Sequence, residues 1–383
     1  MEFEVRLIID KDVNEIINIF RKNYGDNYPY REFYKPDWVL RGIYNKSLLW
    51  LVAAEKGGGK ILASASLILE AGDHDDLMGE FGRLVTDPDL QKSGIGRILI
   101  ETLAYAAEQR LEFGFGEARV VHLGSQKIME SLGFTPLGFE PLKFITTRRE
   151  NTAVYGKLFG HAKELRNNRI LIVPEVEPLA KHVINSMNLE TDFNVDDYVG
   201  RYSIGKDLEL FIIDELSMPR LLRIEMGRVS SPEIFGNLHI NYGFFKITEQ
   251  NAQYLVANKK GKPVGAIGYI HDYIDDKVKI FEMVAKDDFV KGYLIDAIDA
   301  YIISSLRAKY IEIDVSAYSP RIQKTFLELG YYPIVYFPSM VFQDIERLDV
   351  VRFAKVNAKY DLGKIILTDK VKEVFNIVDS QFK

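Results

Sequence analysis

The sequence predicts an α+β protein in which strands outnumber helices. Apolar runs of strand length recur along the chain, and glycines at 57–59 join two of them. This is typical of a hairpin, because glycine adopts positive φ at little cost. One longer stretch, 94–111, has apolar residues at helical spacing. Hairpins mixed with a single helical crossover favour a mixed, mostly antiparallel sheet flanked by helices over strict strand–helix alternation.

The first part of the chain divides into elements at recognisable start and stop residues. Asp10 can cap the first helix, Pro36 opens the second, and Gly133 ends the last. The expected strands are 3–9, 48–55, 61–69, 78–86, 117–122 and 139–146. The expected helices are 13–20, 36–44, 94–111 and 125–132.

The same order of elements recurs from about residue 208. The run MESLGFTPLGF at 129–139 resembles FLELGYYPIVY at 326–336, since each is a short helix that ends in Leu-Gly-aromatic and leads into a strand. The intervening residues begin with a polar stretch, 148–168, that predicts a helical connector. The expected units are a first domain at 1–147, the connector at 148–207 and a second, similar domain at 208–383.

Composition excludes several classes of function. The chain has 383 residues, 49 Lys and Arg against 55 Asp and Glu, and a net charge of −6, which argues against nucleic-acid binding. There is no cysteine, so disulfides, thiolate metal sites and a catalytic thiol are excluded. The histidines show no metal-ligand spacing, and we expect no metal. Without a secretory N-terminus or a long apolar run, we expect a cytoplasmic protein with no membrane association.

The residues with the clearest chemical meaning are 84–97, LVTDPDLQKSGIGR. An apolar strand ends, a tight loop follows, and a helix begins at Gly94 to Gly96. Free amides and the helix dipole at such a junction can bind a phosphate or pyrophosphate, although a plain strand-to-helix turn fits the spacing equally well. The pattern lacks the endings of a P-loop and of the dinucleotide fingerprint.

This stretch resembles motif A of the GNAT N-acetyltransferase superfamily, Gln/Arg-x-x-Gly-x-Gly/Ala, at Gln91, Gly94 and Gly96. The order of elements over 1–146 and the Leu-Gly-Phe at 132–134 are also similar to that family. The resemblance implies two acyl-CoA N-acyltransferase folds in tandem, the second of them degenerate.

The resemblance further implies acetyl-CoA or another acyl-CoA as the donor substrate. In the family, main-chain amides hold the pyrophosphate and the pantetheine arm lies along a strand beside them. The residues that this implies as CoA contacts are Leu84, Val85, Thr86, Gln91, Lys92, Ser93, Gly94, Ile95, Gly96, Arg97 and Ser125. Ser125 is also expected to cap its helix.

Two residues are candidates for acid–base chemistry. Glu80 stands where a branch of the family has its general base, and a structural glutamate is the alternative. His122 lies where the family often places an asparagine near the pantetheine, and a structural histidine is equally compatible. The family's usual acid, a tyrosine, is replaced by Met129, which cannot protonate a thiolate.

The sequence leaves two functions open. The first is an acyl-CoA-dependent N-acyltransferase that uses the N-terminal site, and the second is an acyl-CoA-binding regulatory or scaffold protein with little turnover. The aromatic segment 24–38, with Arg31, suits a small amine acceptor better than a protein, although a packed loop would look the same. A homodimer is left open. The second unit keeps one glycine, Gly292, where motif A would lie, and Asp287 and Asp288 would repel a pyrophosphate.

Overall fold

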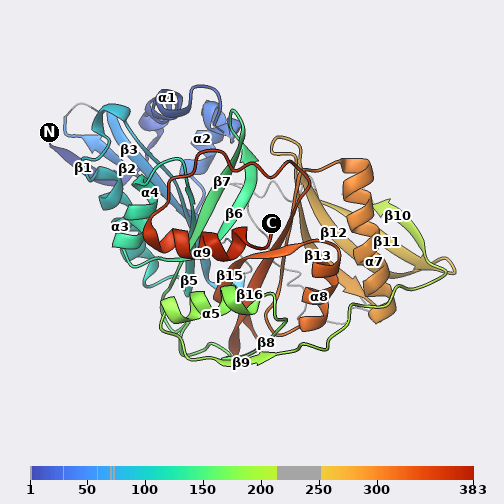
Figure 1. Ribbon diagram of the computed structural model, residues 1–383. Coiled ribbons are helices and arrows are strands. Elements are labelled where there is room, and N and C mark those ends of the chain that lie inside the picture. The colour runs from blue at the N-terminus through green and yellow to red at the C-terminus, as the bar shows by residue number, and fades with distance from the viewer. Residues whose placement is uncertain (1, 29, 58, 70, 72–73, 214–251) are drawn as a thin grey trace.

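The computed structural model describes residues 2–28, 30–57, 59–69, 71, 74–213 and 252–383. Figure 1 shows their arrangement. The strands are β1 (Phe3–Leu7), β2 (Leu48–Glu55), β3 (Ile61–Ile68), β4 (Met78–Thr86), β5 (Phe113–Arg119), β6 (Thr135–Ile145), β7 (Arg149–Leu158), β8 (Arg169–Ile172), β9 (Asp192–Val195), β10 (Glu209–Ile213), β11 (Ala252–Lys259), β12 (Lys262–Asp272), β13 (Lys277–Ala285), β14 (Tyr310–Ser316), β15 (Tyr332–Gln343) and β16 (Glu346–Val356). The α-helices are α1 (Val13–Tyr24), α2 (Pro36–Ile43), α3 (Ile95–Ala107), α4 (Gly124–Ser131), α5 (Glu177–Ser186), α7 (Asp288–Tyr301), α8 (Pro320–Glu328) and α9 (Asp369–Asp379).

One continuous sheet of 14 strands runs through the described part of the chain. Its strand order is β1-β2-β3-β4-β5-β7-β6-β15-β16-β14-β13-β12-β11-β10. The second seven strands repeat the first seven in reverse, with the β6–β15 pairing at the centre. The pairs β4–β5 and β13–β14 are parallel, and the other pairs in this sheet are antiparallel. The predicted mixed α/β class with a mostly antiparallel sheet is therefore confirmed.

Helices cover the two faces of the sheet differently. The buried residues of α1 and α2 form a cluster of their own against β2 and β3. On the other face, buried residues of α3, α5, α7, α8 and α9 belong to a single core that includes strands of both halves. The C-terminal helix α9 lies across β6 of the first half (Figure 1). No helix in the described ranges combines the length and apolarity that a bilayer span requires.

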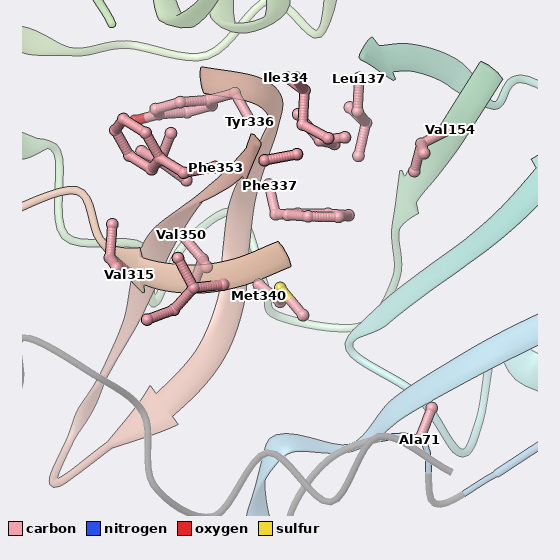
Figure 2. Packing of buried hydrophobic residues seen from close by; sticks show 14 of the residues in the cluster. Ala71, Leu137, Val154, Val315, Ile334, Tyr336, Phe337, Met340, Val350 and Phe353 are labelled. Atoms are coloured by element: carbon pink, nitrogen blue, oxygen red, sulfur yellow. The ribbon is translucent and has the colours of Figure 1, made fainter. Parts of the chain in front are cut away.

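The two halves meet where β6 pairs with β15. A Cβ at Gly138 would lie 2.1 Å from the Ile334 carbonyl oxygen, so only glycine lets the two backbones come this close. Apolar side chains complete the contact, and Figure 2 shows Leu137 and Val154 of the first half facing Phe337 of the second. The halves therefore share one core.

The predicted helical connector is wrong over its first part. Residues 149–158 form β7, which lies between β5 and β6 in the sheet. The stretch looked polar because it contains Glu150, Asn151 and Thr152, yet all three are buried and bonded: Glu150 to Arg119, Asn151 to the Leu142 amide, and Thr152 to Glu140. Their polarity reflects buried partners and not exposure to solvent.

A buried charged cluster joins the halves beside this contact. Lys143 and Glu140 of β6 meet Arg352 of β16 and Glu312 of β14, with Lys143 Nζ 2.9 Å from Glu140 and Arg352 Nη1 2.8 Å from Glu140. Arg352 also holds Asp314, at 2.7 Å. Burial opposes the charge on Asp314, but Arg352 and Lys279 lower its pKa to about 2. Two of these contacts, Glu140–Arg352 and Lys143–Glu312, cross the seam, so separating the halves would break them in a buried setting.

His271 predicts an acid-dependent loss of stability. It lies buried on β12, and among the described residues neither ring nitrogen has a hydrogen-bond partner. Burial lowers its pKa below 6.5, against the opposing influence of Asp276 and Asp272. The His271 imidazole therefore binds a proton more readily in the unfolded chain than in the folded chain. As a result, the free energy of unfolding falls as pH drops below about 6.5.

The test compares His271→Phe with His161→Phe, since His161 is exposed. His271→Phe should make the loss of stability at acid pH shallower in urea titrations between about pH 7 and 5. His161→Phe should leave the loss of stability at acid pH as it is in the wild type. Equal slopes for the wild type and His271→Phe would show that the imidazole is protonated in the folded protein.

Candidate functional site

The sheet of the first half has an opening between β4 and β5, where the two strands stop pairing. These parallel strands pair from Met78↔Phe113 to Phe81↔Gly116 and then separate. β5 goes on to pair with β7 as far as Arg119, whereas from Gly82 onward β4 pairs with no described strand on that side. Unpaired backbone on an inner strand can bind an extended ligand as an added strand would.

A bulge in β4 drives the separation. The β3–β4 register shifts between Ser64 and Ser66, where Arg83 and Leu84 together oppose one residue of β3. Arg83 has φ +54°, which few residues other than glycine adopt. Bulges bend and twist a strand, and this one turns the end of β4 away from β5.

Glu80 lies just before the point of separation and is held by the bulge. It pairs with Ile68, whose side chain packs in the α1–α2 cluster, so Glu80 faces that same side. Its Oε1 accepts a hydrogen bond from Arg83 Nη1 at 2.8 Å. The Glu80 side chain is 20% exposed and that of Arg83 is 2% exposed. The carboxylate is therefore reachable and fixed in position.

Gly116 and Met129 form the vertex of the opening. A Cβ at Gly116 would lie 2.7 Å from the Phe81 carbonyl oxygen and 2.9 Å from Met129 Cε. Met129 of α4 is buried against the last paired residues of β4 and β5. Met129, the residue that replaces the tyrosine implied by the resemblance, therefore places an apolar methyl group at this vertex.

The loop after β4 is held by Asp87. Its side chain is 1% exposed, accepts from the Asp89 amide, and lies 3.1 Å from Lys22 Nζ and 3.4 Å from Lys60 Nζ. Burial opposes ionisation, but these bonds keep the pKa of Asp87 below its ordinary value. The anchored Asp87 fixes where the next residues, 88–97, cross the end of the opening.

The N-terminus of α3 faces solvent at this loop. Gly94 is the N-cap with φ +87°, and a Cβ there would meet no atom within 4 Å. Gly96 is buried, and its Cβ would meet Thr86 Oγ1 at 3.3 Å, so the first turn of α3 lies against the end of β4. The positive end of a helix dipole thus borders open space.

The structure gathers most of the expected CoA contacts at this end of the opening. Exposed residues are Gln91, Lys92, Ser93, Gly94 and Arg97, while Val85, Ile95 and Gly96 are buried and Leu84 and Thr86 lie between these classes. The Val85 side chain belongs to the α1–α2 cluster, so only its backbone is available. Arg97 bonds Ser131 of α4 at 3.3 Å, which brings α4 alongside.

The start of α4 forms the other side of the opening. Ser125 lies in its first turn and does not cap it; the predicted cap is wrong because the helix begins one residue earlier, at Gly124, after Leu123. His122 is exposed, and its Nδ1 accepts from the Gly124 amide at 3.2 Å. Partial burial and the nearby Arg119 lower the His122 pKa. His122 is therefore neutral near pH 7.

Glu80 and His122 do not lie together. Glu80 is opposite Phe115, and β5 rises about 13 Å from Phe115 to its end at Arg119, before the turn that carries His122. Glu80 lies beside the vertex and His122 lies at the outer end. They cannot act on the same proton without an intermediary.

A row of tyrosines spans the opening on the α1–α2 side. The Arg119 guanidinium lies 5.6 Å from the Tyr24 ring and that of Arg83 lies 5.8 Å from the Tyr30 ring. Tyr28 joins them, 4.8 Å from Tyr24 and 5.7 Å from Tyr30. Burial raises the pKa of all three phenols. The row thus connects the β4 side of the opening to the β5 side. Arg31, which the sequence predicts as part of the acceptor segment, is exposed.

The corresponding vertex in the second half is closed by charge. β13 and β14 pair up to Ile280↔Ile313, so Lys279 and Asp314 stand where Glu80 and Glu117 stand in the first half. Lys279 Nζ binds Asp314 at 2.7 Å. At the following helix, α7, the Asp287 side chain caps the N-terminus by accepting from the Val290 amide at 3.0 Å. A carboxylate therefore already occupies the position that is open at Gly94.

Residues 45–136 match the family model described as an acetyltransferase (GNAT) domain. The chain contains a GNAT domain. The match spans β2 to the start of β6 and includes the opening, the bulge and the loop before α3. A comparison with curated proteins finds no match to the chain.

Solved structures similar to the chain include three acetyltransferases. The ribosomal-protein-S5-alanine acetyltransferase from Vibrio fischeri is 22% identical, with TM-score 0.36, over 41% of this chain and 95% of that one. The ribosomal-protein-S18-alanine N-acetyltransferase from Escherichia coli is 20% identical, with TM-score 0.35, over 42% and 95%. The phosphinothricin acetyltransferase from Sinorhizobium meliloti, in complex with acetyl-CoA, is 19% identical, with TM-score 0.38, over 42% and 90%. Values this low carry no information on the substrate.

The GNAT domain contains site features that sequence reasoning missed. The Glu80–Arg83 pair depends on a bulge with positive φ at arginine, which no sequence pattern indicates. Glu117 follows the vertex on β5 and binds Lys143 at 2.6 Å. In the described residues, no three or more His, Asp or Glu side chains gather as metal ligands would.

Proposed function

We propose that the first half is an acyl-CoA-dependent N-acyltransferase, most simply an N-acetyltransferase, that uses the opening between β4 and β5. The observation that carries the proposal is the arrangement at its outer end. A strand with free backbone, a loop and an uncapped helix N-terminus meet there, within the matched GNAT domain. An extended thioester donor with a pyrophosphate fits this combination of an unpaired strand and an anion-binding helix end.

In the proposed complex, the amides of 91–97 hold the pyrophosphate and the backbone of 84–86 pairs with the pantetheine arm. Ser125 and His122 border the arm from α4. A small amine then attacks the thioester carbonyl from the side of the tyrosine row. A C–N bond forms, the C–S bond breaks, and the amine loses one proton while the leaving thiolate gains one.

Glu80 is our candidate for the group that takes the amine proton. It lies beside the vertex, is reachable from the α1–α2 side, and is fixed by Arg83. An acceptor amine with a pKa near 10 is mostly protonated at neutral pH, so removal of its proton by a positioned carboxylate assists attack. His122 is the candidate for contact with the donor, being too far from Glu80 to share its role.

The second half is proposed to be a degenerate copy of the GNAT fold without a CoA site. The reversed strand order, the matching parallel pair and the helices between strands support the tandem arrangement. The Lys279–Asp314 pair and the Asp287 cap oppose pyrophosphate binding there. We propose units at 3–158 and 209–356, since β7 belongs to the first sheet half.

The test of the function is binding followed by turnover. Calorimetry should show one CoA site per chain, and a panel of small amines with acetyl-CoA should release free CoA. If the protein binds CoA but releases no free CoA with any amine, the alternative function, an acyl-CoA-binding regulatory protein, is favoured. The methionine at the vertex is the observation that supports this alternative. Absence of CoA binding would contradict both.

Gln91→Ala should weaken CoA binding little. Gln91 is the side chain that marks the motif, yet it is exposed and backbone amides are proposed to hold the phosphates. We expect a change of no more than about threefold in Kd, within the range of one exposed hydrogen bond. Calorimetry of the variant checks this, and a loss above about 30-fold would mean that the side chain itself binds the donor.

A further inference from the structure

The residues after β16 pass from the second half to the first. Residues 357–368, here called the C-terminal strap, begin where the Asn357 amide donates to the Lys309 carbonyl at 2.8 Å. The strap then crosses the seam, and the Leu362 carbonyl accepts from Asn151 Nδ2 of β7 at 3.0 Å. In Figure 1 this red segment runs across the first half before it enters α9.

The strap ends against the corner between β5 and α4. The Ile366 amide donates to the Val120 carbonyl at 2.7 Å, just beyond the end of β5. Gln126 of α4, which is 0% exposed, donates from Nε2 to the Ile366 carbonyl at 2.8 Å and to the His122 carbonyl at 2.9 Å. Its Oε1 accepts from the Thr368 amide at 3.1 Å. One buried side-chain amide therefore connects the strap to His122, two residues before α4.

Thr368 secures the same end of the strap. Its hydroxyl donates to Glu130 of α4, which also accepts a hydrogen bond from Tyr155 Oη at 3.0 Å. The oxygen of the same hydroxyl accepts from the Val371 amide at 3.4 Å and so caps α9. α9 buries its apolar face against β6 and returns to the second half, where Gln381 Nε2 donates to the Pro333 carbonyl at 3.2 Å. The corner 120–126 is thus held by a segment anchored at both ends on the other half.

We propose that the strap is part of the acyl-CoA site, as the element that positions the corner 120–126. This rests on the proposed function, because His122 and Ser125 of that corner are the proposed donor contacts on α4. Both polar atoms of Gln126 are bonded, so loss of the strap contacts would leave a buried amide and the Val120 carbonyl unpaired. The corner would then move, and the first half would bind CoA well only when the end of the chain is docked on it.

The experiment uses full-length protein and four variants. Thr368→Ala removes the hydroxyl while Thr368→Ser keeps it, and Gln126→Leu removes the side-chain bonds from the corner to the strap. Gln381→Ala is the matched control, because it loosens the far end of the same segment and touches neither α4 nor the opening. Each is measured for CoA affinity, for melting temperature and for hydrogen exchange of the amides at 120–126.

Thr368→Ala and Gln126→Leu should raise the Kd for CoA about threefold to tenfold, the equivalent of one hydrogen bond, with faster exchange at 120–126. Thr368→Ser should keep the wild-type Kd for CoA and the wild-type exchange at 120–126. Gln381→Ala should lower the melting temperature without changing the Kd or the exchange. Unchanged affinity and exchange in Thr368→Ala and Gln126→Leu would overturn the proposal. If wild type binds no CoA while exchange at 120–126 still responds, the proposed function fails and only the mechanical link remains.

Discussion

Gly94→Glu is expected to abolish CoA binding. Gly94 caps α3 with φ +87° and open space around its Cβ position, so the new side chain would extend into the place proposed for the pyrophosphate. Its carboxylate would repel the phosphates and would itself occupy the helix N-terminus. We expect an increase in Kd of more than about 100-fold, near 3 kcal/mol, measured by calorimetry.

Two variants separate charge from backbone strain. Gly261→Glu places the same side chain at φ +73° in open space on the second half, and Gly94→Ala introduces strain at the site without charge. Each glycine replacement should cost about 1 kcal/mol of stability through the left-handed φ. Gly261→Glu should bind CoA normally. If Gly94→Glu also binds normally, the loop before α3 is not the phosphate site.

Glu80→Gln is expected to lower kcat by about 10²–10⁴-fold while leaving the Kd for CoA nearly unchanged. The amide keeps the shape of the carboxylate and can still accept from Arg83, but it cannot take a proton. Stopped assays of CoA release, with a responsive amine at saturating donor, measure the effect.

Glu117→Gln is the comparison, because Glu117 borders the same vertex from β5 and is likewise bonded to a cation, Lys143. If Glu117→Gln loses activity and Glu80→Gln does not, the base is on β5 and our assignment is wrong. If neither variant lowers kcat, water or buffer takes the proton.

The part of the site that is local in sequence could be predicted. Strand, loop and glycine at 84–97 follow one another, so their spacing alone indicates a backbone anion site. The parallel pair and the opening follow from the family resemblance. In contrast, residue type predicts Ser125 as a cap, although α4 starts at Gly124 and uses no side-chain cap.

Features that depend on distant partners could not be predicted. Glu150, Asn151 and Thr152 look like an exposed connector, but their partners include Arg119 and a carbonyl of the strap 211 residues away. Arg83 adopts positive φ in a β-bulge, and Glu80 and Tyr30 contact its guanidinium; a propensity scale contains neither feature. Sequence patterns report local preference, whereas these positions are determined by contacts between elements.

The charged seam has a consequence for the order in which the chain is made. Glu140 is synthesised 212 residues before Arg352, its partner at 2.8 Å. Until β16 leaves the ribosome, Glu140 lacks Arg352 and is left with its partners in the first half, Lys143 and Thr152. The contact between the two halves can therefore close only after β16 has been made, so their docking is a late, nearly post-translational event.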